Sequence, residues 1–187
     1  MEDESLAAGK KNARRKGQTI VCIDESGLSE RPHRLRTWAP KGQTPILQHH
    51  FRWQTLSAIA GMTLWTFYFR LYSGAIRSPQ VVDFLRRLLA EIPGRVLVVW
   101  DRLPSHRSRQ VSKFVDRNRQ RLELHFLPAY APELNPVEYL WAYAKNHRLA
   151  NYCARGLGDL ASSARRALRS SRRRHLITAF WQQAELF

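Results

Sequence analysis

The chain has 187 residues, which suits one domain with at most a short appendage, and its 44% hydrophobic and 11% aromatic content is too rich for a disordered protein. Its 31 Lys and Arg against 15 Asp and Glu give a formal net charge of +16, which points to a polyanionic partner, DNA or RNA before a membrane surface. No apolar run reaches the ~20 residues of a membrane-spanning helix, and two cysteines without a CxxC pair disfavour a zinc–thiolate site and a disulfide framework.

The first half of the chain reads as a tail followed by strands. Residues 1–18 carry the basic run Lys10–Lys16 and no apolar segment typical of a signal peptide, so we expect a flexible basic tail on a cytoplasmic, nucleoid-associated protein. Short runs rich in β-branched and aromatic residues then predict strands. These expected strands cover residues 19–23, 34–39, 52–59 and 64–71. We expect residues 60–62 to form the turn of a hairpin between the last two.

The second half alternates helices with strands. Ser78 is a suitable N-cap and Pro79 suits the first helical position, and the helix is expected to stop before Pro93–Gly94. Residues 95–100 are almost continuously apolar, which is typical of a central strand buried on both faces. The remaining expected elements are a helix over 105–119, a strand over 122–127, and helices over 135–148, 157–169 and 174–185. This order predicts an α/β, ribonuclease H-like fold in which helices flank a mixed sheet, with a catalytic domain over 19–150 and a basic helical C-terminal extension over 151–187.

Three acidic residues occupy the positions where such folds build sites. Asp24 follows the first strand, Asp101 follows the central strand, and Glu138 lies in the first turn of a helix. If the first and fourth strands of the fold are neighbours, the two aspartates lie side by side with Glu138 facing them. Clustered carboxylates repel one another unless a cation compensates them, and oxygen-only ligands favour Mg²⁺ or Mn²⁺. We therefore expect Asp24, Asp101 and Glu138 to hold two divalent ions that act on a phosphodiester.

Other residues near these acids have structural readings of their own. Glu25 is expected to point away from Asp24 and to be peripheral, and Glu133 is a weaker candidate than Glu138. His106 is expected either to orient the loop after Asp101 or to approach the scissile phosphate, and the residues leave both readings open.

Around Glu138, the sequence predicts a helix start. Asn135 suits the N-cap and Pro136 the first helical position, and Trp141 is expected to pack in the core more than to stack on a base.

The same segments resemble motifs of the IS630/Tc1/mariner superfamily of transposases, most closely its bacterial IS630-like branch. Ile23–Gly27 is similar to the first-aspartate motif, Arg36–Pro45 to the stretch that follows it, and Val98–His106 to the second-aspartate motif. Leu127–Trp141, LPAYAPELNPVEYLW, is very close to the glutamate signature and is the most specific match. The resemblance implies a DDE endonuclease domain that cleaves and transfers DNA strands with Mg²⁺ (Mn²⁺ substituting) and inserts at TA dinucleotides. It assigns the metal ligands to Asp24, Asp101 and Glu138.

Two departures from the family pattern shape the expected partners. Arg102–Leu103 stands where the family carries Asn-Ala, so contacts of that loop are expected to differ. No helix-turn-helix region fits in the residues before the first strand, so we expect a split or truncated transposase whose transposon ends are recognised by a separate polypeptide. Members of the family act as dimers, and a homodimer is the corresponding expectation.

A cluster of arginines near the C-terminus is the expected DNA contact. It consists of Arg165, Arg166, Arg172, Arg173 and Arg174. Contacts of this kind with phosphates make binding salt-dependent, whereas the alternative is a solvated helix face. Two other functions stay open from the sequence: a different ribonuclease H-like nuclease, and a non-catalytic DNA-binding remnant.

Overall fold

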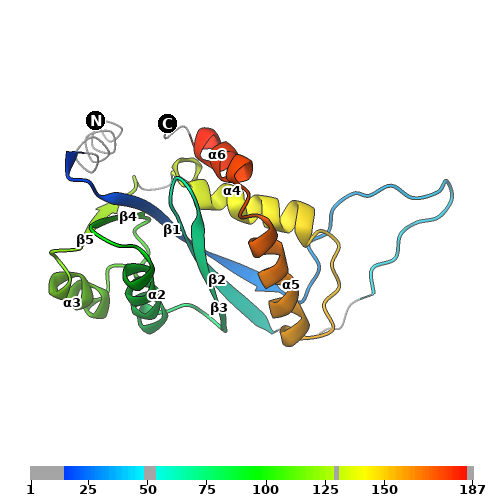
Figure 1. The fold of residues 1–187 in the computed structure, drawn as a ribbon. Coiled ribbons are helices and arrows are strands. Elements are labelled where there is room, and N and C mark those ends of the chain that lie inside the picture. The colour runs from blue at the N-terminus through cyan, green and yellow to red at the C-terminus, as the bar shows by residue number, and fades with distance from the viewer. Residues whose placement is uncertain (1–14, 49–53, 129–130, 185–187) are drawn as a thin grey trace.

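The computed structural model describes residues 15–48, 54–128 and 131–184, and at its centre lies a five-stranded sheet in the order β3-β2-β1-β4-β5 (Figure 1). The strands are β1 (Thr19–Ser29), β2 (Thr55–Met62), β3 (Phe67–Ser73), β4 (Val96–Trp100) and β5 (Leu122–Phe126). The first three pair antiparallel as a meander, whereas β1–β4 and β4–β5 pair parallel. The sheet is therefore mixed, as predicted, with β1 and β4 as neighbours.

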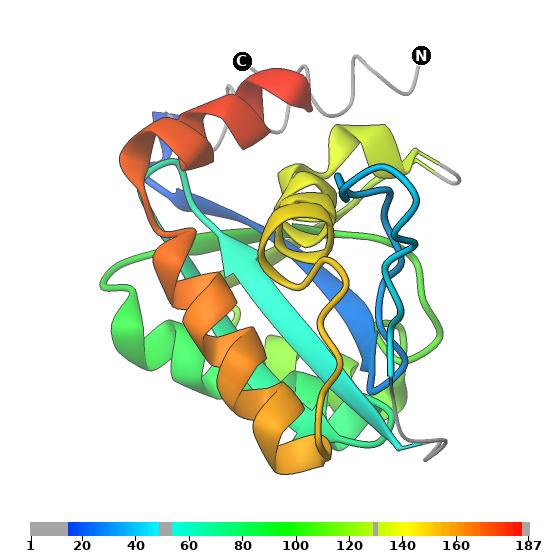
Figure 2. The ribbon, with the colours of Figure 1, turned by 90° about the vertical axis from the view of Figure 1, so that its right-hand side faces the viewer.

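Helices cover both faces of this sheet. One face carries α2 (Ser78–Glu91) and α3 (Arg109–Arg117). The other carries α4 (Pro136–Tyr143), continued by the π-helical turn η2 (Ala144–Arg148), then α5 (Leu157–Ser170) and α6 (Arg174–Gln183); Figure 2 shows these helices together on one side. The short 3₁₀ helix η1 (Pro132–Leu134) precedes α4. No helix in the described part of the chain is long and apolar enough to cross a membrane.

Alternation along β1 decides which face each side chain serves. Val21 and Ile23 pack with α2, whereas Cys22 packs on the opposite face with α4 and α5. All five residues of β4 are buried, as its apolar run predicts for a central strand. Gly61 of β2 leaves no room for a side chain, since a Cβ there would lie 3.0 Å from Val21 Cγ1 and 3.3 Å from the Phe84 ring. A larger residue at this point would force Val21 or Phe84 to shift, so glycine favours the close packing of α2 on the sheet.

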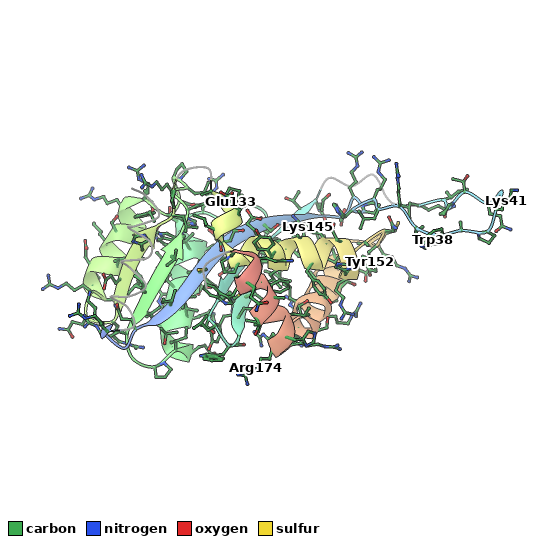
Figure 3. The ribbon with its side chains drawn as sticks, turned by 90° about the horizontal axis from the view of Figure 1, so that it is seen from above. Trp38, Lys41, Glu133, Lys145, Tyr152 and Arg174 are labelled. Carbon is green, nitrogen blue, oxygen red and sulfur yellow. The ribbon has the colours of Figure 1, made fainter. Side chains whose placement is uncertain are left out.

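The first strand is longer than predicted, and the predicted second strand is absent. β1 does not stop at Asp24 but runs to Ser29, because residues 24–29 pair with residues 55–60 of β2. Residues 34–39 form no strand and have no pairing partner among the described residues. They belong instead to an arm that extends away from the sheet, on which the Trp38 side chain is fully exposed, at 101% (Figures 1 and 3). The arm's base is tethered where Asn151 exchanges two hydrogen bonds with the backbone of Leu35.

The remaining boundary errors concern turns and caps. The prediction of a turn at residues 60–62 was wrong, because these residues lie inside β2 and pair on both sides. The hairpin closes at Thr63–Thr66, where Thr63 Oγ1 accepts from the Trp65 and Thr66 amides.

Helix α2 does begin at Ser78, although Arg77 is the N-cap. Helix α3 starts at Arg109 instead of 105, because Ser108 caps it through the Val111 amide. Residues 1–14, 52–53 and 185 of the predicted segments lie outside the described residues.

Candidate active site

The pairing of β1 with β4 fixes the relation between the two aspartates. Cys22 is the register partner of Val99, and Asp24 and Asp101 each follow two residues later. Helix α4 packs on the same region of β1 and carries Glu138 in its first turn. All three acids line one cavity of about 140 Å³, together with Asn135 and residues of the loop 127–132. The structure thus brings together the three acids that lie far apart in the sequence; Glu133 is not among the described residues lining this cavity.

The carboxylates in this cavity destabilise one another's charged forms. Asp24 is only 8% exposed, and burial, followed by the negative charges of Glu138 and Asp101, raises its pKa to about 7. Partial burial and the charge of Asp101 likewise raise the pKa of Glu138, although Lys145 opposes this effect. The cavity is therefore a region of negative potential in which a bound cation removes an unfavourable interaction.

Helix α4 holds Asp24 directly. The Trp141 indole Nε1 donates a hydrogen bond to Asp24 Oδ2 at 2.7 Å, and this bond lowers the Asp24 pKa against the effects above. The Trp141 ring is buried among the residues between α4 and the sheet, where core packing was expected. The hydrogen bond was not predicted from the sequence, and the three-residue spacing from Glu138, which places both residues on nearly one helical face, is the only signal for it.

Asp101 is held from the other face of the sheet. His106 Nδ1 lies 2.8 Å from Asp101 Oδ1, and His106 Nε2 lies 3.1 Å from Glu25 Oε1. The imidazole is 2% exposed and stacks on the Trp100 ring, with centroids 4.3 Å apart and planes 2° from parallel. The loop-orienting reading of His106 is therefore the one that its contacts favour. The prediction that Glu25 is peripheral was wrong: Glu25 does point away from Asp24, but it reaches Asp101 through His106.

Charge explains why this chain of contacts is stable. Two carboxylates on one imidazole are both acceptors, so both ring nitrogens donate when the ring is protonated. Burial alone lowers the His106 pKa, but the bonds and charges of Asp101 and Glu25 outweigh it and raise the pKa to about 9. Burial of Asp101 is in turn outweighed by hydrogen bonds from His106 and the Leu103 amide, so the pKa of Asp101 lies below its usual value.

Asn135 ties the start of α4 to the strand that carries Asp24. Its Oδ1 accepts from the Val137 amide as an N-cap, and its Nδ2 donates to the Ile23 carbonyl at 3.1 Å. Pro136 is the first residue of the helix, as predicted. Because Ile23 immediately precedes Asp24, this one side chain positions Glu138 and Trp141 relative to the aspartate.

The acids fit a site for hard divalent cations, since all the donors are carboxylate oxygens with mutual repulsion to relieve. In the described residues, no group of three or more His, Cys, Asp or Glu side chains lies close enough to hold a single ion. The carboxylates instead surround a shared hollow.

The predicted DNA-contact arginines lie away from this cavity. Arg165 and Arg166 are exposed on α5, where Arg166 donates to Ser163 Oγ. Arg172 and Arg173 connect α5 to α6, and Arg174 begins α6 (Figure 3). None of them is among the residues that line the acidic cavity.

The fold resembles that of several solved structures of Mos1 transposase. The fold is similar to that of the pre-cleavage Mos1 transpososome, with a TM-score of 0.72 and 17% identity, over 98% of this chain and 57% of that one. It is also similar to the Mos1 mariner paired-end complex with Mn, with a TM-score of 0.69, 19% identity, and 98% and 57% coverage. The catalytic domain of Mos1 mariner transposase matches with a TM-score of 0.66 at 14% identity, over 98% of this chain and 85% of that domain. No curated protein matches the chain.

The chain thus spans a little over half the length of the complete Mos1 chains, while it covers most of their catalytic domain. The ribonuclease H-like fold expected from the order of elements is confirmed by this likeness. A family model described as DDE superfamily endonuclease matches residues 19–160, which include all three acids of the cavity. The chain belongs to the DDE superfamily endonucleases, as its resemblance to the IS630/Tc1/mariner superfamily predicted.

Proposed function

We propose that this chain is the catalytic part of a transposase that cleaves and joins DNA strands, using Asp24, Asp101 and Glu138 to hold two Mg²⁺ ions, with Mn²⁺ as a substitute. The observation that carries the proposal is the single cavity lined by these acids, in which burial and the neighbouring carboxylates raise the pKa of Asp24 and of Glu138. Support comes from the family match and from the solved Mos1 paired-end complexes with Mg, with Mn and with the left transposon end.

The metal ions supply the polarising chemistry: when bound, they lower the pKa of an attacking water or 3′-hydroxyl and stabilise the leaving oxyanion. The protein's own contribution is to hold the carboxylates. Trp141 fixes one oxygen of Asp24, and His106 fixes one oxygen of Asp101. With its pKa raised to about 7, Asp24 is partly protonated near neutral pH, so binding of a cation there releases a proton.

The overall charge of +16 draws the polyanionic substrate to the protein, while the catalytic cavity itself is lined by acids. Transposon ends and a TA target are the DNA partners of this proposal. Action as a homodimer and a cytoplasmic, nucleoid-associated location belong to it as well.

A joining assay tests this function against its two rivals. The purified chain is incubated with Mn²⁺, a supercoiled plasmid and a labelled oligonucleotide ending in a free 3′-hydroxyl, and compared with Asp101→Ala. We expect the parent to nick the plasmid and to join the label, and Asp101→Ala to lose both activities almost completely. Asp116→Ala, which removes an exposed acid of α3, is the matched control and should retain both.

Each other result assigns a different function. Nicking without joining identifies a hydrolytic nuclease of the same fold. DNA binding without either reaction identifies a non-catalytic remnant. Equal activity of Asp101→Ala and the parent contradicts the assignment of Asp101.

A further inference from the structure

Two arginines at the junction of α5 and α6 rest on aromatic rings of the β2–β3 hairpin. The guanidinium carbon of Arg172 lies 5.4 Å from the ring centroids of both Phe67 and Phe69. That of Arg174 lies 5.4 Å from the centroid of Trp65, a side chain that is 67% exposed in the hairpin turn. Contacts of this type hold a guanidinium in place through the ring face, so its N–H groups stay available to a partner.

These arginines lack the acidic partners that neutralise others nearby. On the α2 side of the same hairpin, Arg70 and Arg87 both pair with Asp83, at 3.7 and 3.2 Å. Within the described part of the chain, neither Arg172 nor Arg174 forms an ion pair with any acid. A fixed guanidinium with unused N–H donors matches the oxygens of a phosphate.

Arg172 also lines a groove of about 460 Å³ along the free edge of β3. Other lining residues come from β3 and from α2, among them Tyr68, Phe69, Arg70, Arg87 and Glu91. Because β3 is the last strand on its side of the sheet, the groove is bordered by a strand edge that pairs with no other strand among the described residues. Figure 2 shows the α5–α6 corner lying beside the same hairpin.

The register of the sheet relates Arg172 to the acidic cavity. Asp24 is paired with Ala60 of β2, which is paired in turn with Phe69 of β3. Strands lie ~4.8 Å apart, so Phe69 lies about 10 Å from Asp24, and paired residues point to the same face of the sheet. Arg172, which covers Phe69, is therefore on the face that carries Asp24 and at a distance that one DNA molecule can bridge.

We propose that Arg172 and Arg174 form a contact for the DNA phosphodiester backbone along the free edge of β3, distinct from the catalytic cavity. The proposal rests on the proposed function in taking DNA as the substrate, and it singles out two of the predicted contact arginines by geometry. Strand pairing with a second copy is the competing use of such an edge, and it is disfavoured because cationic edges of two identical chains repel.

The test is the salt dependence of DNA binding, measured without metal so that cleavage plays no part. Fluorescence anisotropy of a labelled duplex is recorded in EDTA over about 50–300 mM salt, where each lost phosphate contact lowers the slope of log K against log[salt] by ~0.9. We expect the double variant R172A/R174A to lose about 2 in slope, and Trp65→Ala to weaken binding while every charge is kept.

The matched control is R109A/R117A, which removes two exposed arginines from α3, beside β5 at the opposite edge of the sheet. We expect the slope of R109A/R117A to change by less than half of the change in R172A/R174A. Circular dichroism and melting temperature check that each variant is folded.

Three results overturn the inference: an unchanged slope in R172A/R174A, an equal loss in R109A/R117A, or a change of mass by light scattering that shows the edge to join two copies. Because binding is measured in EDTA, and again with Asp101→Ala, failure of the transposase proposal leaves this result interpretable. If the parent chain joins DNA but R172A/R174A has an unchanged slope, only the proposed contact at Arg172 and Arg174 is contradicted, and the transposase proposal stands.

Discussion

The two aspartates of the cavity have opposite electrostatic settings, although their strands are neighbours. Asp24 is buried next to Glu138, which raises its pKa to about 7, whereas His106 beside Asp101 keeps the pKa of that carboxyl low. Each aspartate is therefore supported by one side chain from a different face of the sheet. Because the pKa of Asp24 is raised and that of Asp101 is lowered, we expect different effects of pH at the two residues.

Asp24 should make the metal-free protein less stable as pH rises. Its pKa is about 7 in the folded chain against an ordinary value of 3.8, so the unfolded state loses its proton first. The contribution of Asp24 to the free energy of unfolding then falls between pH ~4 and ~7, by on the order of 4 kcal/mol at most. Asp24→Asn keeps an acceptor for Trp141 but does not titrate. Urea unfolding at several pH values should show the variant gaining on the parent over this window; parallel curves would contradict the buried, repelled carboxyl.

His106 should stabilise the fold when its imidazole is charged, and this contribution also falls as pH rises, but over a higher pH range than that of Asp24. Its pKa is raised from 6.5 to about 9, so the stability supplied by the imidazolium is complete below pH ~6.5 and is lost as pH rises through 9. We expect His106→Ala to lower the free energy of unfolding by about 2–3 kcal/mol at pH ~6, a modest value because Asp101 and Glu25 are partly solvated. The loss should be smaller at pH ~9.5, because the imidazole of the parent is then largely neutral.

His106→Asn is the matched variant, because its amide can still donate to Asp101 but not to Glu25. It should recover about 1 kcal/mol in the same unfolding measurement. A cost of His106→Ala that does not vary with pH would show that ring packing on Trp100, and not the paired charges, is what His106 supplies.

At the scale of elements, α4 is the part that completes the site, and Asn135 sets its position. Asn135→Ala removes both the N-cap bond to Val137 and the bond to the Ile23 carbonyl, so it should lower the free energy of unfolding by about 2–3 kcal/mol. Asn135→Ser keeps a capping oxygen but cannot span to Ile23, and should cost about 1 kcal/mol. Equal costs for both variants, measured by urea unfolding, would mean that the link to β1 contributes nothing.

The sequence predicted the elements whose signals are local. The continuous apolar run before Asp101 and the Asn135–Pro136 helix start both have the expected structure, and adjacency of the first and fourth strands then brought the acids together. These features depend on neighbouring residues in the chain, which is why pattern and capping rules find them.

Features set by distant partners were missed. Residues 24–29 are polar for a strand, and they extend β1 only because β2 pairs with them. The segment 34–39 has a strand-like composition but no partner, so it forms part of the arm. The bond between Trp141 and Asp24 joins residues 117 positions apart, and no local pattern specifies it.

For the whole molecule, the positive overall charge favours binding of a polyanionic substrate, whereas the acidic cavity favours binding of cations. The chain carries +16 overall, yet its cavity gathers three carboxylates around about 140 Å³. A divalent cation relieves that repulsion, so Mg²⁺ or Mn²⁺ should raise the melting temperature of the parent in proportion to log concentration. Sodium at matched ionic strength is the control, and an equal shift with sodium would attribute the effect to general screening.

The central claim is that Asp24, Asp101 and Glu138 together bind divalent ions, and direct counting of bound Mn²⁺ tests it. Electron paramagnetic resonance reports free Mn²⁺ during titration of the metal-free chain at pH ~8, above the pKa of about 7 for Asp24. We predict about two ions per chain for the parent, unchanged in Glu133→Gln and lost in the double variant D24N/D101N. Equal Mn²⁺ binding by the parent and D24N/D101N would contradict the account.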